Sequence, residues 1–114
     1  MSSRVLIGPF LTRSEAARAA GVSRVEIEHR PDLLRLGGTW AEEVYFSWQF
    51  GSRGADPTMG RLVQALRAWA DDATIADWMF RPQAALGAST PFRWLAASGD
   101  VETAILAFKR SNGR

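Results

Sequence analysis

Apolar residues recur at helical spacing through most of the C-terminal half of the chain. The stripe between residues 62 and 70 predicts one helix, whose start is marked by an aspartate followed by a proline. Similar stripes predict three further helices that begin near residues 72, 90 and 100. Residues 44–50 instead alternate apolar and polar side chains, which is typical of a half-buried strand. The pattern therefore predicts a mainly α fold with little β-structure.

Two short helices are predicted in the N-terminal third, with a glycine between them. Thr12 can cap the first and Ser23 the second, and each has a glutamate three residues later that completes a capping box. Gly21 ends the first helix because glycine adopts the left-handed conformation most readily, and Pro31 ends the second. This is the pattern of a helix-turn-helix, although an ordinary helical corner would share it.

A small β-hairpin is predicted to follow the two helices. Residues 33–36 precede Gly37 and Gly38, a favourable two-residue turn, and residues 44–50 supply the second strand, whose end could also turn helical. A hairpin after a helix-turn-helix is a wing. We therefore expect a winged helix-turn-helix over residues 1–55 and a compact helical, partner-binding region over residues 56–114. The two are expected to pack as one unit, because no flexible linker separates them.

Length and charge narrow these expectations only slightly. The chain has 114 residues, enough for one ordinary domain, and its 14 basic and 12 acidic residues leave a net charge of +2. Such a near balance is weak support for a nucleic-acid partner. No apolar run reaches the roughly 20 residues that a membrane span needs, so we expect a cytoplasmic protein with no membrane partner.

Residues for catalysis are missing from the sequence. The chain has no cysteine and one histidine, His29, which stands between two charged residues. One histidine without cysteine is too few for a zinc site, and no serine has a histidine partner in a nucleophile motif. No phosphate-cradling glycine motif is present. We therefore expect no enzyme activity, no metal and no cofactor.

Basic residues gather in the predicted helix-turn-helix, and we expect this region to bind double-stranded DNA. Arg24 falls at the start of the second helix, where contacts to base edges usually arise, and Ser23 can donate to a phosphate. Glu26 and Glu28 in the same short helix repel phosphates, so a monomer should bind weakly and we expect a homo-oligomer. The candidate DNA-binding residues are Arg13, Ser23, Arg24, His29, Arg30 and Arg35.

The C-terminal half carries a series of spaced motifs. They are Asp77-Trp78, Pro82, Leu86-Gly87, Thr90-Pro91, Leu95 and Gly99-Asp100. With the Phe-Ser-Trp-Gln-Phe string at residues 46–50, they resemble the toxin-binding domain of Xre/MbcA/ParS-type antitoxins. Phe46 departs from that family, which usually has proline there. The helix-turn-helix in turn is similar to those of MerR-like and excisionase-like regulators.

The resemblance implies an antitoxin that binds and neutralises a RES-type, NAD-consuming toxin and represses the shared promoter. Its C-terminal region would cover the toxin, although basic residues there could equally complement the helix dipole. Phe92 or Trp94 is expected to stay exposed, because their helix is too short to bury every side. The partner-binding candidates are Phe92, Trp94, Phe108, Lys109, Arg110 and Arg114. The alternative is a stand-alone winged helix-turn-helix transcriptional regulator with no toxin.

Overall fold

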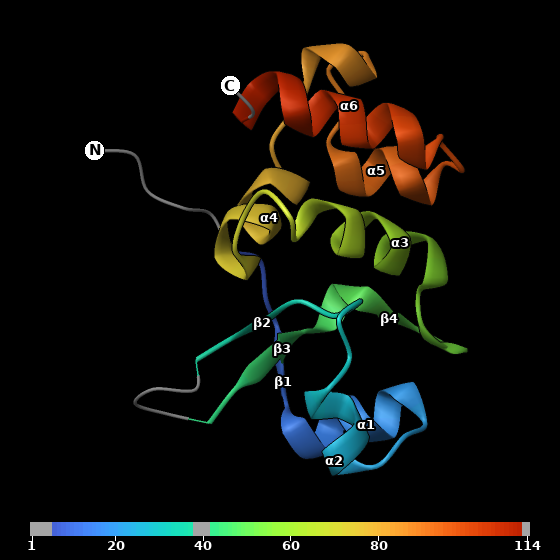
Figure 1. Cartoon of the computed structure of the whole chain (residues 1–114). Helices are drawn as coiled ribbons and strands as arrows, with labels where there is room; N and C mark the ends of the chain where they lie inside the picture. The colour runs from blue at the N-terminus through green and yellow to red at the C-terminus, as the bar shows by residue number, and fades with distance from the viewer. Residues whose placement is uncertain (1–5, 38–41, 113–114) are drawn as a thin grey trace.

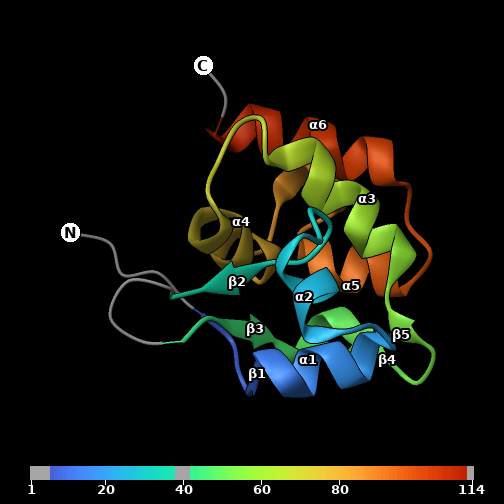
Figure 2. The same ribbon diagram turned by 60° about the horizontal axis from the view of Figure 1, so that its bottom comes forward.

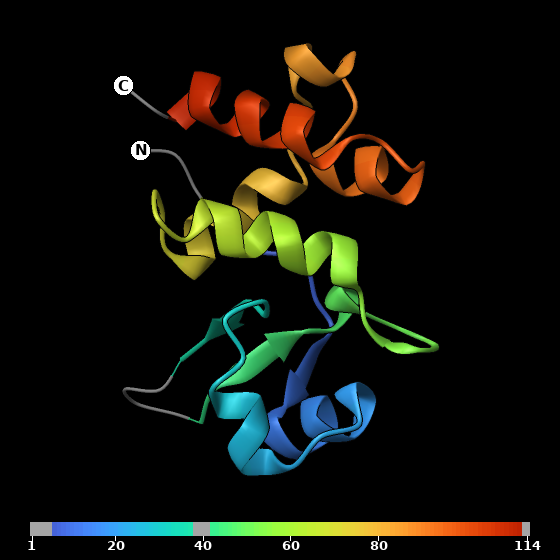
Figure 3. The same ribbon diagram turned by 45° about the vertical axis from the view of Figure 1, so that its right-hand side comes forward.

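The computed structural model describes residues 6–37 and 42–112, and a small sheet lies in it between two groups of helices (Figure 1). Helices α1 (Arg13–Ala20) and α2 (Arg24–Glu28) cover one side of this sheet. The other side carries α3 (Pro57–Leu66), α4 (Asp72–Met79), α5 (Pro91–Ala96) and α6 (Val101–Asn112). Figure 3 shows the same three layers from another side. We call residues 6–55 the head and residues 56–112 the tail.

The sheet is antiparallel, with β3 (Val44–Phe46) between β1 (Phe10–Thr12) and β2 (Arg35–Leu36). Strands β2 and β3 form the wing beside α2, as Figure 2 shows. A second, two-stranded pairing joins β4 (Phe50–Gly51) to β5 (Gly54–Ala55). The fold class is therefore confirmed: the protein is mainly α, a winged helix-turn-helix followed by a compact helical region. Strand β1 was not predicted, since a strand of three residues shows no periodic pattern.

Local sequence signals set the ends of the two head helices as predicted. Thr12 and Ser23 each accept a hydrogen bond from the backbone N–H three residues on, and both capping boxes are complete. Gly21 follows α1 with a φ of 73°, the left-handed conformation that glycine adopts without steric cost. The predicted turn of the wing includes Gly38, which lies outside the described residues.

The predicted strand over residues 44–50 is shorter than expected, and its second half turns helical, the alternative that the sequence left open. The strand ends at Phe46, and a 3₁₀ turn, η1 (Ser47–Gln49), follows it. The segment is not half-buried either, because Tyr45 and Phe46 are both fully buried. Neighbouring side chains of a strand point to opposite faces, so Tyr45 enters the core of the head and Phe46 that of the tail. The sheet thus has helices on both faces.

The tail helices begin where their caps predict, at Asp56, Asp71 and Thr90. The end of α5 differs from the prediction, because Ser98 takes the left-handed conformation while Gly99 does not. Gly99 is required for a different reason: a Cβ there would stand 2.5 Å from the Trp94 indole. A 3₁₀ turn, η2 (Ala84–Leu86), connects α4 to α5 and packs on α6.

Candidate nucleic-acid interface

Helix α2 is the second helix of the helix-turn-helix, the one that enters the major groove in those proteins of this fold that bind DNA. Ile27 is fully buried against Ala16 and Ala17 of α1, and the small alanines let the two helices approach closely. The opposite side of α2 faces solvent, with Arg24 and Val25 exposed. Val25 is 66% exposed. The helix therefore offers a basic and an apolar side chain at its first turn.

Three of the predicted DNA-binding residues lie at the ends of this helix with exposed side chains. Ser23 is the N-cap, and its hydroxyl accepts from the Glu26 N–H at 3.1 Å. Arg24 follows it in the first helical position. His29 ends the helix, with its Nδ1 3.0 Å from the Val25 carbonyl oxygen. The structure therefore brings these three side chains to one exposed element.

The other three predicted residues, Arg13, Arg30 and Arg35, are half-buried and contact oxygen atoms of the protein, and their binding to DNA stays a prediction. Arg13 lies between the carboxylates of Glu28, at 3.2 Å, and Glu43, at 3.6 Å. Arg30 donates to both carboxylate oxygens of Asp32, at 2.8 and 2.7 Å.

Arg35 is held in the same way, by the backbone at the end of α2. It donates to the carbonyl oxygens of Glu28 and Arg30, both at 2.7 Å, and lies over the Tyr45 ring. Its role is therefore to fix the end of α2 against the wing.

Arg67, an arginine of the tail, binds the backbone that follows α2. Arg67 donates to the carbonyl oxygens of Pro31 and Leu33 and to the carboxylate of Asp72. Asp72 in turn accepts from the Arg35 N–H at 2.8 Å. These groups line an open polar hollow of about 460 Å³ between head and tail. Sequence reasoning missed Arg67, since two of its partners are carbonyl oxygens more than 30 residues away.

Gln49 forms a second polar connection beneath the wing. Its side chain is 2% exposed, accepts from the Leu34 N–H, and donates to the carbonyl oxygens of Leu34 and Phe46 at 2.9 and 3.1 Å. All these polar groups are satisfied, so the buried amide costs little and fixes the strand after α2.

The capping glutamates keep the exposed side of the helix-turn-helix acidic as well as basic. Hydrogen bonds from the Ser23 backbone and hydroxyl lower the pKa of Glu26, and those from Thr12 lower the pKa of Glu15. Both carboxylates are therefore ionised at neutral pH. A negative charge beside Arg24 weakens non-specific attraction to phosphates.

The partner-binding prediction for Phe108 is wrong. Its side chain is 1% exposed and packs edge-on against Trp78, with ring centroids 5.1 Å apart. Phe92 and Trp94 are half-buried rather than free: Phe92 stacks on Phe80 at 5.0 Å, and the Trp94 indole N–H donates to the Asp100 carbonyl oxygen at 2.9 Å. The predicted exposed aromatic is therefore not in α5.

Trp69 is the exposed aromatic of the tail, with 57% of its surface accessible. The Lys109 ammonium lies over its ring, 5.1 Å from the centroid. Lys109 and Arg110 are exposed on α6 as expected, whereas Arg114 lies outside the described residues. Sequence reasoning missed Trp69 because its spacing fitted the apolar stripe of α3, and the helix ends before it at Leu66.

Residues 6–37 and 42–112 contain no group of three or more metal-ligating side chains, and no helix in them is long and apolar enough to cross a membrane.

The fold and its exposed α2 define a winged helix-turn-helix protein with a helical extension. No family model matches the chain, and no curated protein matches it. Among solved structures it is similar to the NMR structure of Rv2175c, with a TM-score of 0.67 and 18% sequence identity. The match covers 97% of this chain and 84% of that chain, so it includes both head and tail. At this identity the likeness concerns the fold alone.

Proposed function

We propose that this protein binds double-stranded DNA, with α2 in the major groove and the β2–β3 wing beside it. The observation that carries the proposal is the pair Arg24 and Val25, exposed on a helix whose other side is fixed by Ile27. An arginine is suited to the O6 and N7 acceptors of guanine, and an apolar side chain to the methyl group of thymine. Arg18 is exposed on α1, the helix that crosses the phosphate backbone in helix-turn-helix complexes, and we expect it to contact a phosphate.

The charges around α2 favour selective over general binding. Glu26 and Glu28 reduce the attraction of this surface to phosphates, while Arg24 and Val25 retain groups that distinguish bases. We therefore expect modest affinity for random DNA and a measurable preference among sequences.

The test is a fluorescence-anisotropy titration with labelled random duplex at low salt, followed by selection of preferred sequences from a random pool. Arg24→Ala should weaken binding to the selected site about tenfold, since a good arginine–guanine pair contributes ~1–3 kcal/mol. Arg93→Ala, which removes an exposed arginine of α5, is the matched control and should bind like the wild type. Absence of binding at low salt, or equal loss in both variants, would refute the proposal.

Antitoxin activity is a second candidate, supported by the exposed Lys109 and Arg110 on α6 and by the resemblance of the tail to toxin-binding domains. On this hypothesis the basic end of α6 binds at the dinucleotide site of a RES-type toxin. Co-expression with a RES-domain protein encoded beside this chain should restore growth, and the Lys109→Glu, Arg110→Glu double variant should not. A chain that neither restores growth nor co-purifies with that protein is not an antitoxin.

A further inference from the structure

The outer side of α6 forms a regular line of exposed residues. Glu102, Leu106 and Arg110 are four residues apart, so they lie on one side of the helix, and all three are exposed. Leu106 is 55% exposed, whereas Ala104 and Phe108 on the inner side are buried. We call these three residues the α6 face. Along this face an acidic residue, an apolar residue and a basic residue follow one another.

That order is acidic, apolar and basic, and it is complementary to itself. In the described part of the chain, neither Glu102 nor Arg110 forms an ion pair with another residue. If a second α6 runs antiparallel to the first with a twofold axis at Leu106, Glu102 of each copy lies opposite Arg110 of the other. The two Leu106 side chains then meet at the centre. We propose that the α6 face binds a second copy of this chain in this way.

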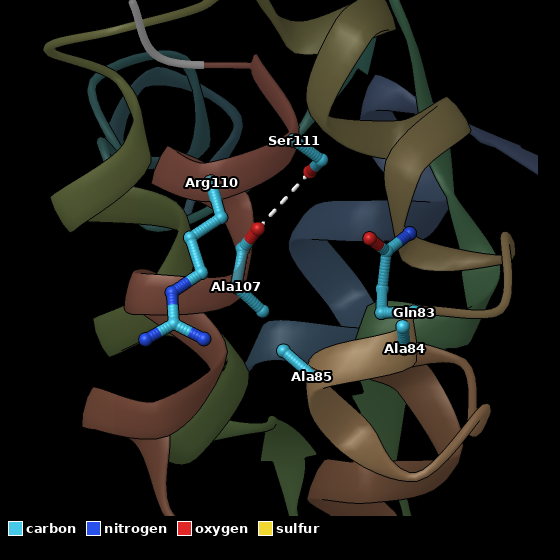
Figure 4. A pocket seen from close by; sticks show the side chains of 6 residues that line it. All are labelled: Gln83, Ala84, Ala85, Ala107, Arg110 and Ser111. Atoms are coloured by element: carbon cyan, nitrogen blue, oxygen red, sulfur yellow. Dashed lines mark hydrogen bonds between the residues drawn. The ribbon is translucent and has the colours of Figure 1, made fainter.

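The surroundings of the α6 face add apolar area to the contact. On the α3 side, Trp69 is exposed beside Lys109. On the η2 side, an open groove of about 400 Å³ is lined by alanine side chains of η2 and α6, with Arg110 at its edge (Figure 4). Apolar groups at the centre with charges around them are the usual arrangement of a protein interface, and tryptophan and arginine are enriched among its strongest contacts.

The size of this surface predicts a weak dimer. A single helix with its flanks from each copy buries less than the roughly 1,600 Å² of a standard interface. The dimer should therefore form in a concentration-dependent manner. It would also have a defined shape, because α6 lies at the end of the molecule away from α1 and α2 (Figure 1). The two recognition helices would face outward at opposite ends, although the proposed dimer does not depend on DNA binding.

Charge reversal offers a sharp test, because each copy contributes both members of the pair. Sedimentation equilibrium of the full chain, without DNA, should show a monomer–dimer equilibrium. Glu102→Arg alone or Arg110→Glu alone places like charges opposite each other and should raise the dissociation constant at least about tenfold. The double variant E102R/R110E restores opposite charges and should dimerise like the wild type. The two single variants, when mixed, should form a heterodimer that neither forms alone.

Two control variants separate the interface from general effects of charge. Arg93→Glu reverses an exposed charge on α5, and Val25→Glu replaces an exposed apolar residue of the head. Both should dimerise normally, whereas Leu106→Glu should not. Circular dichroism checks that every variant stays folded.

A wild type that remains monomeric up to its solubility limit would leave this face to another partner, such as a toxin, and overturn the proposal. So would a dimer whose dissociation constant is unchanged in both single variants, or single variants that fail to pair when mixed.

Discussion

The head and the tail of this protein have hydrophobic cores of very different size. The buried cluster of the head includes two alanines, Ala16 and Ala17, beside Ile27, Leu33 and Tyr45. The cluster of the tail is much larger and combines leucines, methionines and aromatic rings from all four tail helices. Hydrophobic stabilisation scales with the apolar area removed from water, so the tail provides most of it. The head, which carries the proposed DNA contacts, depends on its neighbour.

The strand β3 makes this dependence direct. Its adjacent residues Tyr45 and Phe46 enter the two clusters on opposite faces of the sheet. Gly60 of α3 further allows close approach, since a Cβ there would stand 3.0 Å from the Asp32 Cβ. Helix α2 therefore lies on a sheet whose far side is covered by the tail. A substitution in the tail core should therefore also destabilise the head, whereas a substitution in the head core should destabilise the tail less.

The largest expected effect comes from removing the shared aromatic. Phe46→Ala should lower the free energy of unfolding by ~3–5 kcal/mol, because it leaves a cavity beneath the sheet. Head and tail should still unfold in one transition, which urea unfolding followed by both tryptophan fluorescence and circular dichroism can check.

Phe10→Ala is the matched control for this change. Phe10 contacts Phe46 at a centroid distance of 5.2 Å but is 41% exposed, so its loss should cost only about 1 kcal/mol. Two separate unfolding transitions in Phe46→Ala would show that head and tail unfold independently. This would contradict the dependence of the head on the tail.

Features that depend on neighbouring residues could be predicted from the sequence. The capping residues Thr12, Ser23 and Asp56 act within one turn of their own helices, so their residue types and spacing suffice. The helix-turn-helix, the wing and the helical tail followed from these signals. The place of Arg24 in the first position of α2 could be predicted for the same reason.

Features that depend on distant backbone atoms could not be predicted. The hydrogen bonds of Arg35 to the carbonyl oxygens at the end of α2 are of this kind. Phe108 and Trp69 both fitted apolar stripes, and only the actual contact of α3 with α6 decides which one is covered. Sequence spacing gives the face of a helix, but not what lies opposite that face.

A smaller loss is expected from the buried amide that joins the wing to β3. Gln49→Leu is close in volume but leaves the N–H and carbonyl of Leu34 without partners, which should cost ~2–3 kcal/mol. The measurement is urea unfolding, with Gln83→Leu, a half-buried glutamine of the tail, for comparison. Equal stabilities of Gln49→Leu and wild type would contradict this prediction, because they would mean that the Leu34 N–H and carbonyl find other partners in the variant.

The next change tests whether the tail orients α2. Arg67→Met removes the donors to Pro31 and Leu33 and should cost ~1–2 kcal/mol, because these hydrogen bonds involve a charged group that is partly exposed. Amide hydrogen exchange in α2 should accelerate while that in α6 stays unchanged. If DNA binding weakens with the same dependence on salt, Arg67 acts through α2. A flatter salt dependence would instead indicate a direct phosphate contact.

The smallest effect concerns Asp32, whose ion pair with Arg30 belongs to the head alone. Hydrogen bonds from Arg30 lower the pKa of Asp32 in the folded state, so the pair stabilises the fold above the carboxyl pKa of the unfolded chain, about 3.9. This stabilisation is lost as the pH falls through the lower pKa of the folded state. Asp32→Asn should therefore cost less than about 1 kcal/mol at pH 7, and the difference from the wild type should shrink below about pH 4. Urea unfolding of both proteins at a series of pH values measures this difference in the free energy of unfolding. A difference that grows on acidification would mean that the protonated form of Asp32, rather than its ion pair with Arg30, stabilises the fold. The head would then depend less on charged contacts than its structure indicates.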